Sequence, residues 1–306
     1  MRYYSFSNYL KDRYGTKVWR VSLSAGFSCP NKDRPGGGGG CIFCNEAGFS
    51  RYAASALSLA EQIEKSIKEI RDKKKAAKFI AYFQNATNTY GDLEALKTAY
   101  DVITGYPEIV ALYISTRPDC VDESKLDLIA SYTRRYEVWI EYGVQTAHDR
   151  TLKIINRGHT FAESADAVKK TVSKGIKAAA HIILGLPGEN RQDMIATARE
   201  ISKLPVSGIK LHTLHVMLNT ELEKMYRAGG IKILEMEEYI GLACDFLENT
   251  RKDCVIFRLA SDARDELLIA PKWMNDKFSV INGIENELEA RGTAQGYSLR
   301  EGHAKE

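Results

Sequence analysis

Short strand-like runs alternate with amphipathic helical stretches through most of this chain, from about Val18 to about Asn249. Strands are predicted at 17–24, 78–83, 109–115, 138–144, 177–184 and 209–215. Helices are predicted at 59–71, 93–103, 123–134, 162–173, 191–204 and 235–249. Strands separated by helices of this length form parallel βαβ units with right-handed crossovers. Six such units are two short of a full (β/α)₈ barrel, so the expected fold is α/β, an open partial barrel.

The alternation changes near Thr250. A further strand is predicted at 255–259 and a terminal helix at 276–291, followed by polar residues. We therefore expect a core domain over residues 1–249, with the N-terminal segment included, and a short extension over 250–306 that packs on it.

Composition and charge narrow the class of protein. Hydrophobic residues make up 44% of the chain and charged residues 27%, which is ordinary for a globular protein. No run approaches the roughly eighteen apolar residues of a membrane-spanning helix, and the first residues lack the apolar stretch of a signal peptide. We expect a cytoplasmic protein with no membrane partner. The net charge of +3 does not by itself indicate nucleic-acid binding, and the lysine-rich run at 65–78 is interpreted as a solvated helix end rather than an RNA-binding patch.

Polar or glycine-rich residues follow each of the predicted strands. In chain order they are Cys29, Gln84–Tyr90, Ser115–Pro118, Gln145, Gly185–Gly188 and His215. In parallel α/β folds, chemistry gathers at the carboxyl ends of the strands. We therefore expect these residues to lie together at one end of the barrel.

Three of the six cysteines, Cys29, Cys41 and Cys44, lie within sixteen positions. The remaining ones are dispersed, at Cys120, Cys244 and Cys254. In a reducing compartment such clustering indicates metal or redox chemistry more than disulfides, and thiolates suit iron–sulfur clusters or zinc. The five glycines at 36–40 can adopt left-handed conformations that let the loop between the cysteines fold back.

The number of clustered cysteines matters. A structural zinc ion or an electron-transfer cluster normally has every metal position filled by the protein. A site that is one ligand short leaves an iron free for a cosubstrate. The spacing alone leaves open this kind of cluster or a structural zinc, with the fourth zinc ligand from His212, His215 or Cys120.

Several stretches resemble the radical S-adenosylmethionine (SAM) superfamily. They are SCPNKDRPGGGGGCIFCN, YFQNATNTY, STRPDC, EYGVQTAHDRTLKIINRGHT, HIILGLPGE, KLHTLHVMLNT and RLASDARDELLIAPKW. The wide cysteine spacing resembles the branch that contains the catalytic subunit of Elongator, and the match is closer still to the YhcC/YtqA-like (MnmL-type) family. The resemblance implies a partial barrel of the radical SAM type. It also implies one [4Fe–4S] cluster held by Cys29, Cys41 and Cys44, and reductive cleavage of SAM to a 5′-deoxyadenosyl radical.

The resemblance further implies which residues bind SAM. The run after the second strand matches the place where the family holds the amino group of SAM. Backbone carbonyls and small polar side chains suit an ammonium group there. The matching positions are Gln84, Asn85, Thr87, Asn88 and Thr89.

Other positions match the rest of the SAM pocket. Ser115 stands where relatives have a glutamate, and a serine can hydrogen-bond to SAM but cannot offset its sulfonium charge. Gln145 and Arg157 match the glutamine and the arginine of the pocket, and the planar fork of an arginine binds carboxylates. His181 falls where relatives often carry an aspartate for the ribose hydroxyls. No catalytic residue is predicted.

The motifs specify radical generation but not which C–H bond is broken. The resemblance implies tRNA as the partner, through its anticodon loop. The wobble uridine (U34) would be converted from 5-carboxymethylaminomethyluridine to 5-aminomethyluridine, ahead of a methyltransferase. An external electron donor such as flavodoxin or ferredoxin is also implied. Two other functions stay open: radical SAM chemistry on a small metabolite or protein side chain, and a non-enzymatic, zinc-stabilised binding module.

Overall fold

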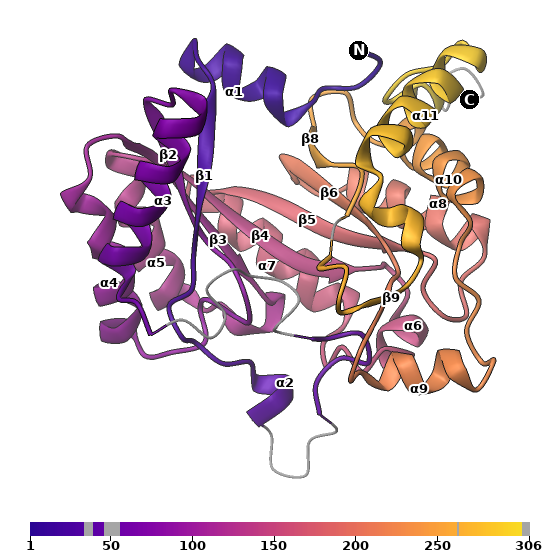
Figure 1. The fold of residues 1–306 in the computed structure, drawn as a ribbon, viewed down its shortest axis with the longest axis horizontal. Coiled ribbons are helices and arrows are strands. Elements are labelled where there is room, and N and C mark those ends of the chain that lie inside the picture. Colours follow the sequence, from indigo (N-terminus) through magenta and orange to yellow (C-terminus); the bar gives the residue numbers. More distant parts are fainter. Residues whose placement is uncertain (34–38, 46–55, 262, 302–306) are drawn as a thin grey trace.

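The structure is a computed structural model that describes residues 1–33, 39–45, 56–261 and 263–301. In these residues the main sheet has seven parallel strands, in the order β1-β2-β3-β4-β5-β6-β8. They are β1 (Val18–Leu23), β2 (Lys78–Phe83), β3 (Ile109–Thr116), β4 (Glu137–Gln145), β5 (Lys177–Leu184), β6 (Gly208–Thr213) and β8 (Val255–Arg258). The sheet curls into a half-barrel (Figure 1). The predicted α/β partial barrel is confirmed.

Helices cover the outer face of the sheet (Figure 1). They are α3 (Leu59–Lys74), α4 (Leu93–Asp101), α5 (Glu123–Ser131), α7 (Phe161–Ser173), α8 (Arg191–Ser202) and α10 (Met236–Glu248). Short 3₁₀ turns at Val102–Gly105 and Tyr132–Arg134 extend α4 and α5 to the predicted ends. Ser58, Thr160 and Asn190 start α3, α7 and α8 with capping boxes, in which an acidic side chain three residues later completes the cap. Local sequence therefore specifies where these helices begin.

Several short elements that the sequence did not reveal lie at the two ends of the barrel. Helix α1 (Phe6–Tyr14) crosses one end, and α2 (Pro30–Asp33), α6 (Asp149–Ile154) and α9 (Glu221–Arg227) gather at the other end (Figure 1). Strands β7 (Val216–Met217) and β9 (Leu268–Ala270) form an antiparallel pair. The remaining elements are the predicted helix α11 (Lys277–Ala290), the final turn α12 (Ser298–Glu301), and 3₁₀ turns at Pro118–Cys120 and Lys272–Asn275.

The described apolar residues form four clusters, and the two with the most residues are an outer and an inner one. The outer cluster lies between the sheet and its helices, and the inner cluster fills part of the barrel. The inner cluster is aromatic: Trp139 packs on Phe257 with ring centroids 4.9 Å apart, and Tyr9 of α1 packs on Trp139 at 5.7 Å. Both faces of the strands are buried, so their sequences are almost continuously apolar. This packing closes the α1 end of the barrel and leaves the other end open.

The first residues of the chain lie against the edge strand β8. Ser5 forms a parallel bridge with Ile256, whose N–H donates to the carbonyl of Tyr4 at 2.8 Å. The side chain of Gln295 accepts from the N–H of Tyr4 at 2.8 Å and donates to the carbonyl of Cys254 at 2.7 Å. The two terminal segments therefore cover an edge that would otherwise be unpaired.

The strand count differs from the prediction. Six strands were expected in the barrel, and the described residues place a seventh, β8, beside β6 in the same sheet. The sequence at 255–259 was predicted to be a strand, but it was assigned to the C-terminal extension because the alternation of strands and helices changes near Thr250. The division into a core (1–249) and an extension (250–306) stays a prediction. No described helix combines the length and the apolar character needed to cross a bilayer.

Candidate active site

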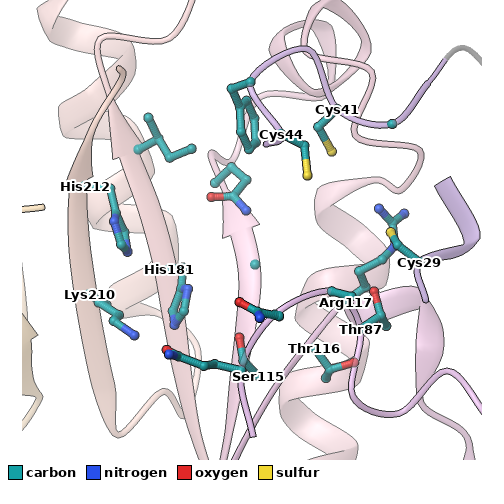
Figure 2. Close-up of a pocket in the computed structure, with 18 of the residues that line it drawn as sticks. Cys29, Cys41, Cys44, Thr87, Ser115, Thr116, Arg117, His181, Lys210 and His212 are labelled. Atoms are coloured by element: carbon teal, nitrogen blue, oxygen red, sulfur yellow. The ribbon is translucent and has the colours of Figure 1, made fainter. Parts of the chain in front are cut away.

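A cavity of about 730 Å³ opens at the carboxyl ends of the strands. All seven strands of the main sheet contribute to its described lining, together with the loop that carries the clustered cysteines. Figure 2 shows Cys41 and Cys44 on one side, with His181, Lys210 and His212 across the cavity from Cys29. The polar residues that follow the strands are thus largely brought together, as the sequence predicted.

The cysteine loop is fastened to two distant parts of the chain. All three clustered cysteines line the cavity: Cys29, Cys41 and Cys44. The N–H of Cys44 donates to the carbonyl of Cys41 at 3.0 Å, which closes a tight turn. Between them, Ile42 accepts from Leu222 at 2.8 Å and donates to Ile155 at 3.2 Å through its backbone. These bonds hold two thiols on one turn.

The glycines before Cys41 fold back as expected where they are described. Gly39 and Gly40 have φ of +69° and +92°, in the left-handed region that favours glycine. Residues 36–38 lie outside the described residues. The side chain of Asn156 donates to the carbonyl of Gly40 at 2.7 Å, and Asn31 donates to the carbonyl of Asn156 at 2.5 Å. Asn156 is therefore the anchor of this turn.

Nitrogen donors approach the sulfur of Cys41. Asn31 Nδ2 lies 3.5 Å from Cys41 Sγ, and Arg157 Nη1 lies 3.4 Å from it. Donors at this distance stabilise a thiolate, the form that binds metal. Among the described residues, no three His, Cys, Asp or Glu side chains converge as ligands of a single metal ion. A four-iron cluster meets each thiolate through a different iron, so three thiols around one cavity fit it.

The loop after β2 presents unpaired polar atoms. Gln84, Asn85 and Thr87 line the cavity. Within the described residues, Asn85 Nδ2 and Oδ1 and Thr87 Oγ1 are buried and lack a hydrogen-bond partner. Asn85 and Ala86 have φ of +77° and +49°, a conformation that costs energy outside glycine. Because buried polar atoms are normally paired, this loop is suited to a polar ligand.

Asn88 and Thr89 are not part of the described cavity lining. Their side chains instead fasten the loop after β2 to neighbouring segments of the chain. Asn88 Nδ2 donates to the carbonyl of Ser115 at 3.0 Å. Thr89 Oγ1 lies 2.6 Å from Thr116 Oγ1 and donates to the carbonyl of Cys120 at 2.7 Å. Their side chains are already satisfied by protein, which leaves Asn85 and Thr87 to meet a ligand.

Ser115, Gln145, Arg157 and His181 all line the cavity. Arg157 donates through Nε and Nη2 to the carbonyl of Gly143, at 3.1 and 2.8 Å. A Cβ at Gly143 would lie 2.3 Å from Arg157 Nη2 and 2.8 Å from Gln145 Nε2. Position 143 therefore has to be glycine for both side chains to keep their places.

Arg117 is a lining residue to which the sequence reading gave no role. Its side chain is 2% exposed and grips Asp119 through Nε and Nη2, both at 2.9 Å. Its third nitrogen, Nη1, is buried and has no partner within the described residues. The signal for it was available, because Arg117 directly follows the end of β3 in the STRPDC stretch.

A buried charged network lies deeper in the barrel. Glu141 Oε2 accepts from Tyr82 Oη at 2.8 Å and Lys210 Nζ at 2.9 Å, and it lies 2.6 Å from His181 Nε2. Glu141 is fully buried and Lys210 is 4% exposed. Burial acts to raise the pKa of Glu141, but the charge of Lys210 and the bond to His181 outweigh it and hold that pKa well below its usual value.

In the same network, the pKa values of the two basic residues, Lys210 and His181, are lowered. Burial lowers the pKa of Lys210 to about 7, although the charge of Glu141 opposes the shift. Burial, followed by the nearby charge of Lys210, lowers the pKa of His181 to about 4. His181 is therefore neutral near pH 7. The sequence reading missed Lys210, a single charge inside an apolar strand.

Of the three residues considered as a fourth zinc ligand, the two histidines lie in the cavity lining and the cysteine does not. His212 and His215 both line the cavity, with His212 Nδ1 3.0 Å from Ser261 Oγ. Cys120 is absent from the described lining, and burial raises the pKa of its thiol to about 12. Tyr142, which follows Glu141 in β4, belongs to the outer cluster, where its hydroxyl lies 2.6 Å from Thr171 Oγ1.

Sequence comparisons identify relatives over most of the chain. The family model described as the radical SAM superfamily matches residues 34–201, and the Radical_SAM C-terminal domain matches residues 206–290. YtqA of Bacillus subtilis is 38% identical over 296 residues, which cover 96% of this chain and 92% of YtqA. The tRNA uridine(34) acetyltransferase of Dehalococcoides mccartyi is 31% identical over 205 residues, covering 66% of this chain and 42% of that protein.

A solved structure shares the fold. The archaeal Elp3 of Methanocaldococcus infernus aligns with a TM-score of 0.71 at 18% identity, over 91% of this chain and 64% of that one. The radical SAM family model covers more than half of the chain, and the identity to YtqA extends over nearly all of it. The chain therefore belongs to the radical SAM superfamily and, within it, to the YhcC/YtqA-like family.

Proposed function

We propose that this chain holds a [4Fe–4S] cluster through Cys29, Cys41 and Cys44, binds SAM beside it, and modifies the wobble uridine of tRNA. One observation carries the proposal: the three cysteines share a cavity with the unpaired buried polar atoms of Asn85 and Thr87. Membership of the radical SAM superfamily supports both cofactors.

When bound, the reduced cluster supplies the electron that splits the S–C5′ bond of SAM and yields a 5′-deoxyadenosyl radical. The contribution of the chain is to hold the thiolates and to leave one iron without a protein ligand. Asn31 and Arg157, whose N–H groups approach Cys41, stabilise its negative charge.

The SAM contacts follow from the unpaired atoms of the cavity. Asn85 Oδ1 and Thr87 Oγ1 would accept from the ammonium group, and Arg117 Nη1 and Arg157 would serve the carboxylate. The other proposed contacts, from lining residues with polar side chains, are Gln84, Ser115, Gln145 and His181. Asn88 and Thr89 act by supporting the loop.

The proposed substrate is the anticodon loop of tRNA. A relative named for tRNA uridine(34) chemistry and the fold shared with Elp3 support this class of substrate. A wobble base lies in a single-stranded loop, so it can enter a cavity without opening a duplex. A cytoplasmic location and an electron donor such as flavodoxin or ferredoxin belong to the same proposal.

The proposed reaction turns 5-carboxymethylaminomethyluridine into 5-aminomethyluridine, the acceptor for a later methyltransferase. A hydrogen atom leaves the carbon between the nitrogen and the carboxylate and converts the deoxyadenosyl radical to 5′-deoxyadenosine. The carbon radical then loses one electron to a one-electron acceptor and one proton, which gives an imine. Water hydrolyses the imine to the amine and a two-carbon aldehyde acid.

The first test is made on anaerobically purified protein. We expect a brown protein with broad visible absorption, about four irons per chain, and release of 5′-deoxyadenosine when SAM and a reductant are added. A colourless protein that contains zinc and releases no 5′-deoxyadenosine from SAM would instead support a zinc-stabilised binding module.

The second test separates tRNA from other substrates. Nucleoside mass spectrometry of tRNA from a deletion strain should show 5-carboxymethylaminomethyluridine accumulating and 5-aminomethyluridine and its methylated product lost. Unchanged tRNA nucleosides, together with intact SAM cleavage by the purified protein, would point to a small metabolite or a protein side chain.

A further inference from the structure

The described lining of the cavity is rich in cationic side chains. Among the described residues, its lining includes seven arginine or lysine side chains and no aspartate or glutamate. They are Arg20, Lys32, Arg117, Arg157, Lys210, Arg258 and Arg264. Arg117 is neutralised by Asp119, and Arg157 lies on the cysteine side of the cavity. Arg20 and Lys210 lie toward the barrel interior.

Arg20 and Lys210 are called here the mid-barrel cations. Arg20 lies in the middle of β1, Lys210 in the middle of β6, and Arg258 at the end of β8, where it pairs in register with Lys210. The buried carboxylate bonded to this group is Glu141, whose Oε2 is shared among Lys210, Tyr82 and His181. Arg20 Nε and Nη2 take no part in these bonds, and Glu141 Oε1 is left without a partner among the described residues.

Arg20 has an unused binding edge. Its guanidinium carbon lies 4.4 Å from the ring centroid of Phe6, 5.6 Å from that of Tyr82 and 5.7 Å from that of Phe257. These rings hold the group in place, but its Nε and Nη2 are buried and unpaired among the described residues. Nε and Nη2 form the fork with which arginines grip carboxylates. Arg117 grips Asp119 with this same pair of nitrogens, at 2.9 Å each.

Depth limits what can reach this edge. Arg20 and Lys210 lie at mid-strand, below the strand ends that carry the cysteines and the loop after β2. A phosphodiester, which continues as a chain on both sides, cannot be threaded to that depth. A terminal anionic group on a flexible substituent can be.

We propose that Arg20, together with Lys210, binds a carboxylate at the end of the reacting substituent of the substrate. The inference rests on the proposed function, because that substituent ends in a carboxylate. With its carboxylate held there, the substituent would place its reacting carbon, the one bonded to the amine nitrogen, between the mid-barrel cations and the SAM side of the cavity. The group would thus select substrates by charge and position the C–H bond.

The test compares 5-carboxymethylaminomethyluridine nucleoside with its methyl ester, which keeps the C–H bond but removes the charge. Binding is measured by anaerobic calorimetry on the protein as isolated, so the result does not depend on turnover. We expect the acid to bind roughly 10–100-fold more tightly than the ester. Arg20→Gln should abolish most of this preference. Arg20→Lys, which keeps the charge but loses the fork, should retain only a small part of it.

The matched control is Arg13→Gln, which removes an exposed arginine at the α1 end of the barrel and should keep the full preference. Equal binding of acid and ester by the wild type would overturn the inference. So would an unchanged preference in a folded Arg20→Gln or Arg20→Lys variant, or a loss of SAM affinity in these variants, since Arg20 would then serve the carboxylate of SAM. Failure of the wild type to cleave SAM or to alter tRNA would instead count against the proposed function.

Discussion

At the strand ends, polar atoms of Asn85, Thr87 and Arg117 are buried without partners among the described residues. At mid-strand depth, Glu141 Oε2 instead accepts hydrogen bonds from both Lys210 and Tyr82. The first region, with the cysteines, is called the strand-end rim, and the second the mid-barrel network. Unpaired atoms at the rim are costly until a ligand meets them. Paired charges in the network are set before any ligand arrives.

This difference separates two tasks. The rim is suited to cofactors that supply the missing partners, and the network fixes charge in the place where a substrate would end. Arg20 departs from this pattern, because its fork is left open as the rim atoms are, and Glu141 Oε1 is also unpaired among the described residues. The comparison therefore predicts that rim changes remove chemistry, whereas network changes alter stability and charge.

The largest effect is expected at the rim. Cys41→Ala should remove iron binding and with it nearly all 5′-deoxyadenosine formation, because a cluster held by two thiolates is not retained. Iron content and product release measure this. Cys254→Ala is the control, since that thiol is buried away from the cavity lining; it should keep both activities and lose only about 1 kcal/mol of stability. Full iron content in Cys41→Ala would break the assignment.

A large stability effect is expected in the network. Glu141→Gln leaves Lys210 buried without its counter-charge, so at pH 6 the free energy of unfolding should fall by about 3 kcal/mol. Chemical denaturation measures it. The double variant Glu141→Gln with Lys210→Met should recover part of the loss, because no buried charge is left unpaired. If Glu141→Gln alone were as stable as wild type, the Glu141–Lys210 pair would not contribute to stability as predicted.

A smaller effect sharpens the role of the rim. Gly143→Ala brings a Cβ into the space of Arg157 and Gln145, so Arg157 must leave the carbonyl of Gly143 and move relative to Cys41. We expect SAM affinity, measured by calorimetry, to fall about tenfold, about 1.4 kcal/mol. Gly105→Ala is the matched control, because a Cβ there meets no atom within 4 Å. Equal SAM affinity in both variants would remove Arg157 from the SAM site.

The smallest effect, counted per pH unit, concerns the pH dependence of stability. The pKa of Lys210 is lowered to about 7 in the folded state, and an unfolded lysine keeps its ordinary value of about 10.4. Between these values the unfolded chain binds more protons, so this group makes stability rise with pH. Relative to Lys210→Met, wild type should gain up to about 1 kcal/mol per pH unit above pH 7. Denaturation midpoints at pH 6.5, 7.5 and 8.5 test this, and a gain toward low pH would reverse the sign.

The rim was largely predictable because its residues follow strands. Strand ends are visible where an apolar run gives way to polar or glycine residues, and this signal pointed to Cys29, Asn85 and Gln145. The same signal covers Arg117, whose pairing with Asp119 could not be seen in advance. The turn at Gly185–Gly188 follows a strand too, yet it does not belong to the described cavity lining.

The mid-barrel network was not predictable in the same way. Both faces of these strands are buried, so alternation does not tell which side chains point inward. Glu141 and Tyr142 are neighbours in sequence, and only the structure shows that Glu141 joins the network while Tyr142 faces the helices. The seventh strand was missed as a barrel strand for a related reason, because its pairing with β6 is a long-range contact.

By itself, the sequence determined the order of strands and helices, the cysteine loop and the strand-end positions, because each depends on residues close together in the chain. The tertiary structure decided which buried charges have partners. Whether an arginine is neutralised, as Arg117 is, or keeps an open fork, as Arg20 does, depends on side chains that distant strands bring to the same depth.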